Sequence, residues 1–145
     1  MMTVADNSAT IAETQAETPV SFPLGLLGFE AYKHFVLIHS PEEEPFGWLQ
    51  VPEDSRLAFL VLSPFCVVPD YQAEISEEDA RFLGLKSPGD ALIYNIVTLR
   101  PGAPATINLK GPIVINRETM VGRQVVLVNA AAYAVQHPLP ADDSN

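Results

Sequence analysis

The sequence predicts an all-β, mostly antiparallel fold: a barrel-like or split-barrel sheet capped by one short helix. Short apolar runs rich in Val, Ile, Leu, Phe and Thr alternate with breakers that contain Pro and Gly. The runs have the length of strands, and turns roughly every ten residues are typical of antiparallel barrels and sandwiches. The expected strands are residues 20–22, 35–40, 46–51, 57–63, 91–100, 105–110, 113–116 and 123–129.

One segment, residues 75–84, breaks the β pattern and predicts the short helix. Ser76 can cap the first turn, and Asp79 follows three residues later, which is a variant of the capping box. Gly84 can end the helix in a left-handed conformation. Phe82 and Leu83 are expected to cover one open end of the β core.

The chain of 145 residues has the length of one ordinary domain. Residues 1–18 are rich in Ala, Thr, Ser, Glu and Gln and have little to bury, which predicts a disordered N-terminal extension. Residues 19–138 are the expected single β domain, and residues 139–145 a flexible C-terminal tail. The sequence contains no run that could span a membrane and no secretory signal at its start, so a cytoplasmic location is expected.

The chain is acidic, with 8 Lys and Arg against 18 Asp and Glu and a formal net charge of −10. This balance repels phosphate backbones, so direct nucleic-acid binding is not expected, and it favours basic partners. Five acids fall within ten residues: Asp70, Glu74, Glu77, Glu78 and Asp79. They permit two interpretations, helix capping with solubility or a patch that meets a basic surface on a partner.

The sequence lacks the usual signatures of catalysis and metal binding. The three histidines, His34, His39 and His137, have no metal-ligand spacing, and neither a nucleophile elbow nor a phosphate-binding glycine loop is present. The single cysteine, Cys66, has apolar neighbours, which predicts a buried and inert thiol. We therefore expect no catalytic residue, no metal site and no cofactor.

Four segments are more specific than this general β pattern: residues 22–30 (FPLGLLGFE), 45–50 (PFGWLQ), 106–116 (TINLKGPIVIN) and 122–127 (GRQVVL). Gly25 and Gly28 permit positive φ or close backbone approach, which lets Phe22 and Phe29 reach the core. Pro112 cannot donate to a ladder and is expected at a bulge or edge. The simplest role for the asparagines at 108 and 116 is to satisfy nearby backbone groups.

In this order and spacing the four segments resemble the flagellar assembly factor FliW family, over about residues 20–139. The residues that match the family motifs, with an expected structural role, are Phe22, Pro23, Gly25, Gly28, Phe29, Leu49, Gln50, Asn108, Leu109, Pro112, Asn116 and Gln124. The resemblance implies a cytosolic protein that binds the translational repressor CsrA and keeps it from silencing flagellin messenger RNA. It also implies that flagellin binds the factor and that the two partners exclude one another.

The expected partner-binding residues are the acids around the helix with two neighbours: Asp70, Tyr71, Glu74, Glu77, Glu78, Asp79 and Glu30. A monomer that contacts neither nucleic acid nor membrane is expected. Two alternatives stay open. One is a small β-barrel that binds a flavin or another nucleotide, and the other is a generic β interaction module, oligomeric through an exposed sheet edge.

Overall fold

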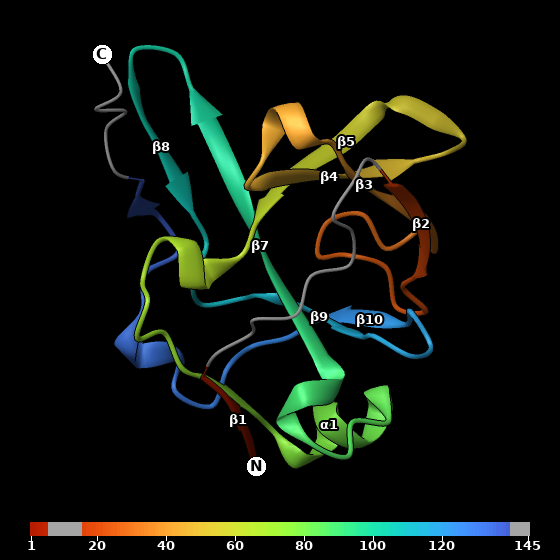
Figure 1. The fold of residues 1–145 in the computed structure, drawn as a ribbon, viewed down its shortest axis with the longest axis vertical. Coiled ribbons are helices and arrows are strands. Elements are labelled where there is room, and N and C mark those ends of the chain that lie inside the picture. The colour runs from red at the N-terminus through yellow and green to blue at the C-terminus, as the bar shows by residue number, and fades with distance from the viewer. Residues whose placement is uncertain (6–15, 140–145) are drawn as a thin grey trace.

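The computed structural model describes residues 1–5 and 16–139. One α-helix, α1 (Glu77–Leu83), accompanies the strands of the described chain (Figure 1). The strands are β1 (Met2–Val4), β2 (Ala16–Ser21), β3 (His34–His39), β4 (Phe46–Val51), β5 (Asp54–Leu62), β6 (Ala73–Ile75), β7 (Ala91–Arg100), β8 (Ala103–Ile107), β9 (Ile113–Asn116), β10 (Gly122–Gln124) and β11 (His137–Pro138). The predicted all-β class with a single helix is confirmed.

The main sheet follows the order β10-β9-β7-β5-β4-β3-β2, and all of its ladders are antiparallel. The sheet curls so that its two edge strands approach each other (Figure 1). Among the described residues, β2 meets the chain just before β10 at one bridge, Ser21 with Val121, where the Ser21 N–H donates to the Met120 carbonyl at 3.0 Å. The sheet is therefore a split barrel, as predicted, and not a closed one.

Strand β7 separates two hydrophobic clusters and is buried on both of its faces over Ala91–Asn95. Leu92 and Tyr94 point into the barrel, where they join Phe22, Phe35 and Leu49. The alternate residues, Ala91 and Ile93, belong to the second cluster, which β1, β6 and α1 cover. This alternation follows from the two-residue period of a strand.

Helix α1 has the two caps that the sequence predicts, although Ile75, at the start of the predicted segment, belongs to β6. The Ser76 hydroxyl accepts the Asp79 N–H at 3.1 Å, and Gly84 takes φ 69°. Leu83 is buried in the second cluster, as expected. Phe82 is 40% exposed, so the prediction that it covers the core is wrong. Its position on the outer side of a helix of two turns leaves it in contact with Arg123 instead.

The predicted boundaries of the domain need correction at both ends. Met2–Val4 forms β1, which pairs with β6, and Val4 is 1% exposed. Residues 16–18 belong to β2, paired along β3. Residues 1–18 are therefore not a disordered extension throughout, because long-range pairing and the burial of Val4 order parts with little apolar content. Leu139 also belongs to the body, since its N–H donates to the Ala105 carbonyl. Residues 6–15 and 140–145 lie outside the described residues.

Two predicted strands are shorter than expected. Segment 123–129 pairs with β9 only as far as Gln124, and beyond it the chain makes single bonds to separate partners such as Pro112 and Glu74. Segment 105–110 is strand only to Ile107 and begins earlier, at Ala103. Strands β1, β6 and β11 were not predicted, because each has at most three residues and depends on a distant partner.

Candidate protein-binding surface

The loop of residues 22–30 is shaped by its two glycines. Gly25 has φ 69°, and a Cβ there would lie 2.5 Å from Glu30 Cα; Gly28 has φ 85° and open space around it. Of the two features that the glycines were expected to permit, Gly25 shows both positive φ and close backbone approach, and Gly28 shows positive φ alone. Phe22 is fully buried, whereas Phe29 is half-buried and packs edge-on against Phe59 at 5.0 Å between ring centroids.

The same loop holds two leucines outward. Leu24 is 48% exposed and Leu27 is 68% exposed. The Leu27 N–H donates to Gln124 Oε1 at 3.1 Å, and the Gly28 N–H donates to Glu30 Oε2. That second bond holds the pKa of the Glu30 carboxyl below its usual value, because it stabilises the charged form. The loop therefore presents two apolar side chains on a constrained backbone.

Polar side chains connect the motif segments to one another. Gln124 also donates through Nε2 to the Gly111 carbonyl at 3.2 Å, and so bridges the first, third and fourth segments. Asn108 Oδ1 accepts the N–H groups of Lys110 and Gly111. The local backbone role predicted for Asn108 is confirmed.

Asn116 also satisfies nearby backbone groups, and it bonds in addition to a backbone group far along the chain. Its Oδ1 accepts the N–H groups of Glu118 and Thr119, and its Nδ2 donates to the Leu83 carbonyl at 2.8 Å. It therefore satisfies the hairpin between β9 and β10 and also the end of α1. The second contact was not predicted, because it spans 33 residues.

The remaining motif residues have structural positions. Leu49 and Leu109 are fully buried, Pro112 is buried immediately before β9, and Gln50 lies in β4 opposite Val36 and Ala58. Pro112 thus precedes the first residue of β9, where its carbonyl accepts the Val125 N–H. Pro23 is exposed beside Leu24.

Two of the predicted partner-binding residues lie in the interior. Tyr71 is fully buried, and its hydroxyl donates to the Leu109 carbonyl at 2.7 Å while its ring lies 4.6 Å from that of Tyr133. Asp79 is 8% exposed and pairs with Arg123 at 3.0 Å. Placing these two at an interaction surface was wrong, because tertiary partners far along the chain draw both side chains inward.

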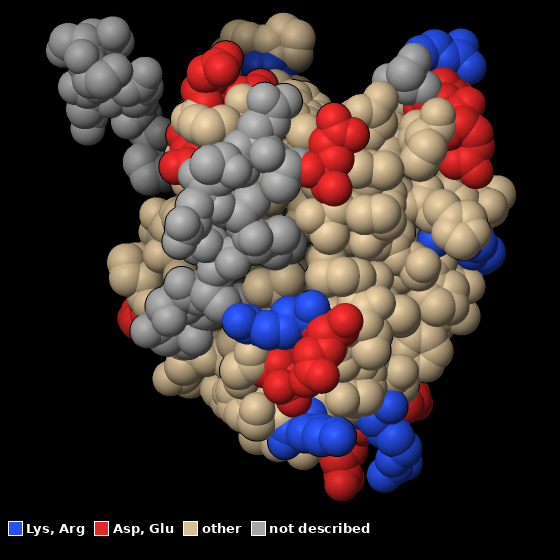
Figure 2. Space-filling view, turned by 45° about the vertical axis from the view of Figure 1, so that its right-hand side comes forward, with Lys and Arg blue, Asp and Glu red and all other residues tan. Residues whose placement is uncertain are grey.

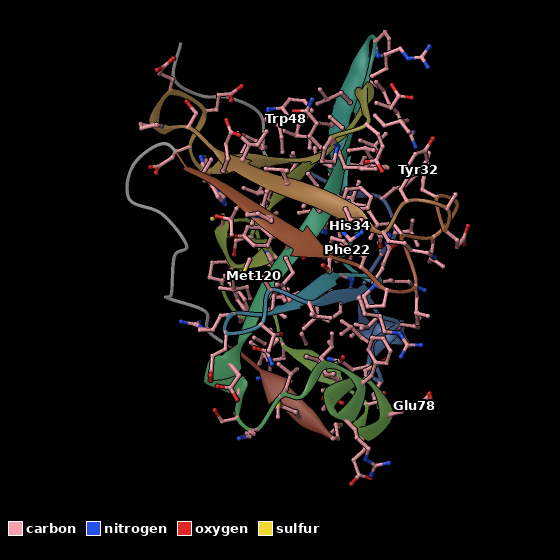
Figure 3. All side chains as sticks on the ribbon, turned by 90° about the vertical axis from the view of Figure 1, so that its right-hand side faces the viewer. Phe22, Tyr32, His34, Trp48, Glu78 and Met120 are labelled. Atoms are coloured by element: carbon pink, nitrogen blue, oxygen red, sulfur yellow. The ribbon has the colours of Figure 1, made fainter. Side chains whose placement is uncertain are left out.

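The other predicted acids do reach the surface. Asp70, Glu77, Glu78 and Glu30 are exposed, and Glu74 is half-buried on β6. Figure 3 shows Glu78 pointing outward from α1, below the level of Phe22, where the 22–30 loop begins. Acids and bases are interspersed at the lower end of the face in Figure 2, the end where Figure 1 places α1. Asp70, Glu77 and Glu78, which are exposed, and the half-buried Glu74 are called the helix acids below.

An exposed apolar surface adjoins the helix acids. Arg123 stacks over the Phe82 ring at 4.9 Å and lines, with Leu24 and Leu27, a cleft of about 120 Å³. Residues 125–128 alternate in burial. Val125 and Leu127 are buried, whereas Val126 and Val128 are exposed. The exposed apolar residues of this region, called the apolar face below, are Leu24, Leu27, Phe82, Val126 and Val128.

One hydrogen bond and one helical spacing place parts of the apolar face beside the helix acids. Val128 donates its N–H to the Glu74 carbonyl at 2.8 Å. Glu78 precedes Phe82 by four residues, so the two share one side of α1. The apolar face was not predicted, because a run such as 125–128 (VVLV) does not indicate which valines turn outward. Exposed apolar side chains beside charged residues are typical of protein-binding surfaces.

Other kinds of site have little support in the described chain. Within residues 1–5 and 16–139, no group of three His, Cys, Asp or Glu side chains could hold a metal ion. No helix in that part of the chain has the length and apolar character needed to cross a bilayer. Cys66 is exposed, so the prediction of a buried thiol is wrong; the turn at Pro64–Cys66 carries it outward. Its sulfur is still partly removed from water, which raises the pKa of the thiol.

The fold and surface together define a small split-barrel protein with a constrained apolar and acidic surface, features typical of a protein that acts by binding other proteins. Comparison with known proteins agrees at the level of family. The sequence matches the family model described as "FliW protein" over residues 3–139. The chain belongs to the FliW family of flagellar assembly factors.

Individual relatives support this assignment. The flagellar assembly factor FliW of Treponema denticola is 34% identical over 142 residues, which cover 97% of this chain and 95% of that protein. The corresponding factor of Thermotoga neapolitana is 42% identical over 120 residues, 81% of this chain and 80% of the relative. A crystal structure of the flagellar assembly factor FliW superposes with a TM-score of 0.77 at 30% identity, covering 99% of this chain and 98% of the other.

Proposed function

We propose that this chain binds the translational repressor CsrA in the cytoplasm, relieves repression of flagellin messenger RNA, and binds flagellin in competition with the repressor. In this proposal it acts by binding, as a monomer, and catalyses no reaction. Membership of the FliW family supports a role in flagellar assembly. The partners come from the resemblance of the motif segments.

The observation that carries the repressor part is the position of the helix acids. Four carboxylates are gathered on β6, α1 and the turn before them, beside the apolar face. Asp79 adds little to this field because Arg123 neutralises it. Charge of one sign beside an apolar surface speeds the approach of a basic partner and orients it. RNA-binding proteins carry such basic surfaces.

Reversal of two helix acids, Glu74→Lys with Glu78→Lys, is expected to weaken binding of CsrA about tenfold or more and to flatten its dependence on salt. The reason is that two attractive interactions become repulsive while the interior of the protein is unchanged. Calorimetric titration over a series of salt concentrations measures both effects.

A matched control is Glu17→Lys with Glu53→Lys, which changes the net charge equally at two exposed positions away from α1. Unchanged affinity in the helix variant would contradict the proposed surface. Equal loss in the control would show that only the net charge of −10 matters.

The partners themselves are tested with the full chain as bait in an extract of flagellated cells. Capture of both CsrA and flagellin is expected, with loss of the repressor when purified flagellin is added in excess. Capture of neither would favour a generic β interaction module. A yellow colour in the purified protein would favour the flavin-binding alternative.

A further inference from the structure

A second surface lies at the other end of the molecule from α1. The turn at Pro41–Glu43 and strands β4, β5, β7 and β8 border a groove of about 450 Å³. Figure 1 shows this turn at the top of the barrel and α1 at the bottom; in Figure 3 Trp48 and Glu78 mark the same two ends. The groove is lined by Glu42, Glu43, Glu44, Phe46, Leu60, Leu99, Ala105 and Leu139.

The floor of the groove is apolar and firmly supported. Phe46, Leu60, Ala105 and Leu139 are half-buried and pack against the second hydrophobic cluster. Leu99 is 66% exposed at its edge. One exposed leucine is ordinary on a protein surface, but five apolar side chains along one depression form a surface that a partner can cover with a gain in free energy.

The rim of the groove has one sign of charge. Its lining contains three consecutive glutamates, all exposed, and neither lysine nor arginine. The turn that carries them is held by the Glu43 N–H, which donates to the Ser40 carbonyl at 3.0 Å, and by a bond from Trp48 Nε1 to Glu43 Oε2 at 3.4 Å. The carboxylates therefore stand beside the apolar floor on a defined backbone.

We infer that this groove binds a cationic amphipathic segment of a protein partner, with apolar side chains on the floor and Lys or Arg side chains against the three glutamates. Charge selects this occupant over the others. A second copy of this chain carries a net charge of −10, and an anionic lipid surface is repelled in the same way. The inference is independent of repressor binding by the helix acids, because the two surfaces lie at opposite ends of the barrel.

The test uses fluorescence anisotropy with a labelled amphipathic helical peptide of Leu and Lys and a scrambled peptide of the same composition. Glu42→Gln, Glu43→Gln and Glu44→Gln together are expected to weaken binding of the amphipathic peptide about tenfold. The single change Leu99→Gln is expected to weaken it about fivefold. All four side chains are exposed, so the variants are expected to remain folded, with thermal unfolding as the check.

Matched controls are the triple change Glu74→Gln, Glu77→Gln and Glu78→Gln, which removes equal charge near α1, and Leu27→Gln, which replaces an equally exposed leucine. Both controls are expected to bind within about twofold of the unchanged protein. Equal losses in the two triple variants, or equal binding of the scrambled peptide, would overturn the inference in favour of general charge attraction. A dimer in sedimentation that Leu99→Gln dissociates would overturn it in favour of a second copy.

One variant distinguishes a failure of the groove proposal from a failure of the proposal that the helix acids bind the repressor. The variant Glu74→Lys with Glu78→Lys is expected to lose CsrA while still binding the amphipathic peptide. Loss of peptide binding in that variant would contradict a separate groove site without bearing on the repressor surface.

Discussion

Phe22→Ala is expected to lower the free energy of unfolding by about 4 kcal/mol, the largest effect anticipated for a single substitution in this chain. The ring is fully buried and lies edge-on to Phe35, with 5.2 Å between the centroids. It also fills the space left by Gly122, where a Cβ would lie 2.6 Å from Phe22 Cε1. Truncation therefore leaves a cavity where the two edges of the split barrel meet.

Urea denaturation followed by circular dichroism measures this change. Leu24→Ala, on the same loop but 48% exposed, is the control and is expected to change stability by less than about 0.5 kcal/mol. If Phe22→Ala does not fold, Phe22→Leu should retain the fold with a loss of about 1–2 kcal/mol. A loss below about 1 kcal/mol for Phe22→Ala would show that the ring is not a core element.

Gly25→Ala is expected to cost about 3 kcal/mol, from two sources. A residue with a side chain resists φ 69°, and the new Cβ would lie 2.5 Å from Glu30 Cα and 2.8 Å from the Glu30 carbonyl oxygen. Both neighbouring atoms are backbone, so no side-chain rotation relieves the clash. Thermal and urea unfolding both report the loss.

The variant Gly28→Ala distinguishes the cost of positive φ from the cost of the clash with Glu30. Gly28 has φ 85°, but a Cβ added there would have nothing within 4 Å, so only the conformational cost of about 1 kcal/mol is expected. Equal costs at the two glycines would contradict the close approach of the loop to Glu30. Because the loop holds Leu24 and Leu27 outward, Gly25→Ala is also expected to disturb the apolar face. Gly28→Ala should leave intact the part of the apolar face that lies away from the loop.

Some features followed from the sequence because the interactions that produce them are local. The bounds of α1 depend on Ser76 three residues before Asp79 and on Gly84 at the other end, all within ten residues. The turn at residues 25–28 depends on two glycines that accept positive φ. Asn108 bonds to groups two and three residues away. Such contacts form whatever the rest of the chain does, so residue type and spacing predict them.

The candidate surface could be predicted only in part, because the contacts that shape it join residues far apart in the sequence. Asp79 was expected at the surface, but its partner Arg123 lies 44 residues further on, and Tyr71 is drawn inward by the Leu109 carbonyl. The exposed valines after Gln124 could not be distinguished from their buried neighbours, since one apolar run is compatible with either assignment.

By itself, then, the sequence determined the fold class, the single helix, the glycine turns and the family resemblance. Only the tertiary structure decided that Met2–Val4 is ordered by β6 and that the acids divide into a buried, ion-paired Asp79 and the helix acids. It also decided that an acidic rim borders an apolar groove at the end of the barrel opposite α1. The physical reason is the sequence separation of the interacting residues. Local bonds depend on neighbouring residues, whereas burial and surface placement depend on segments that meet only after folding.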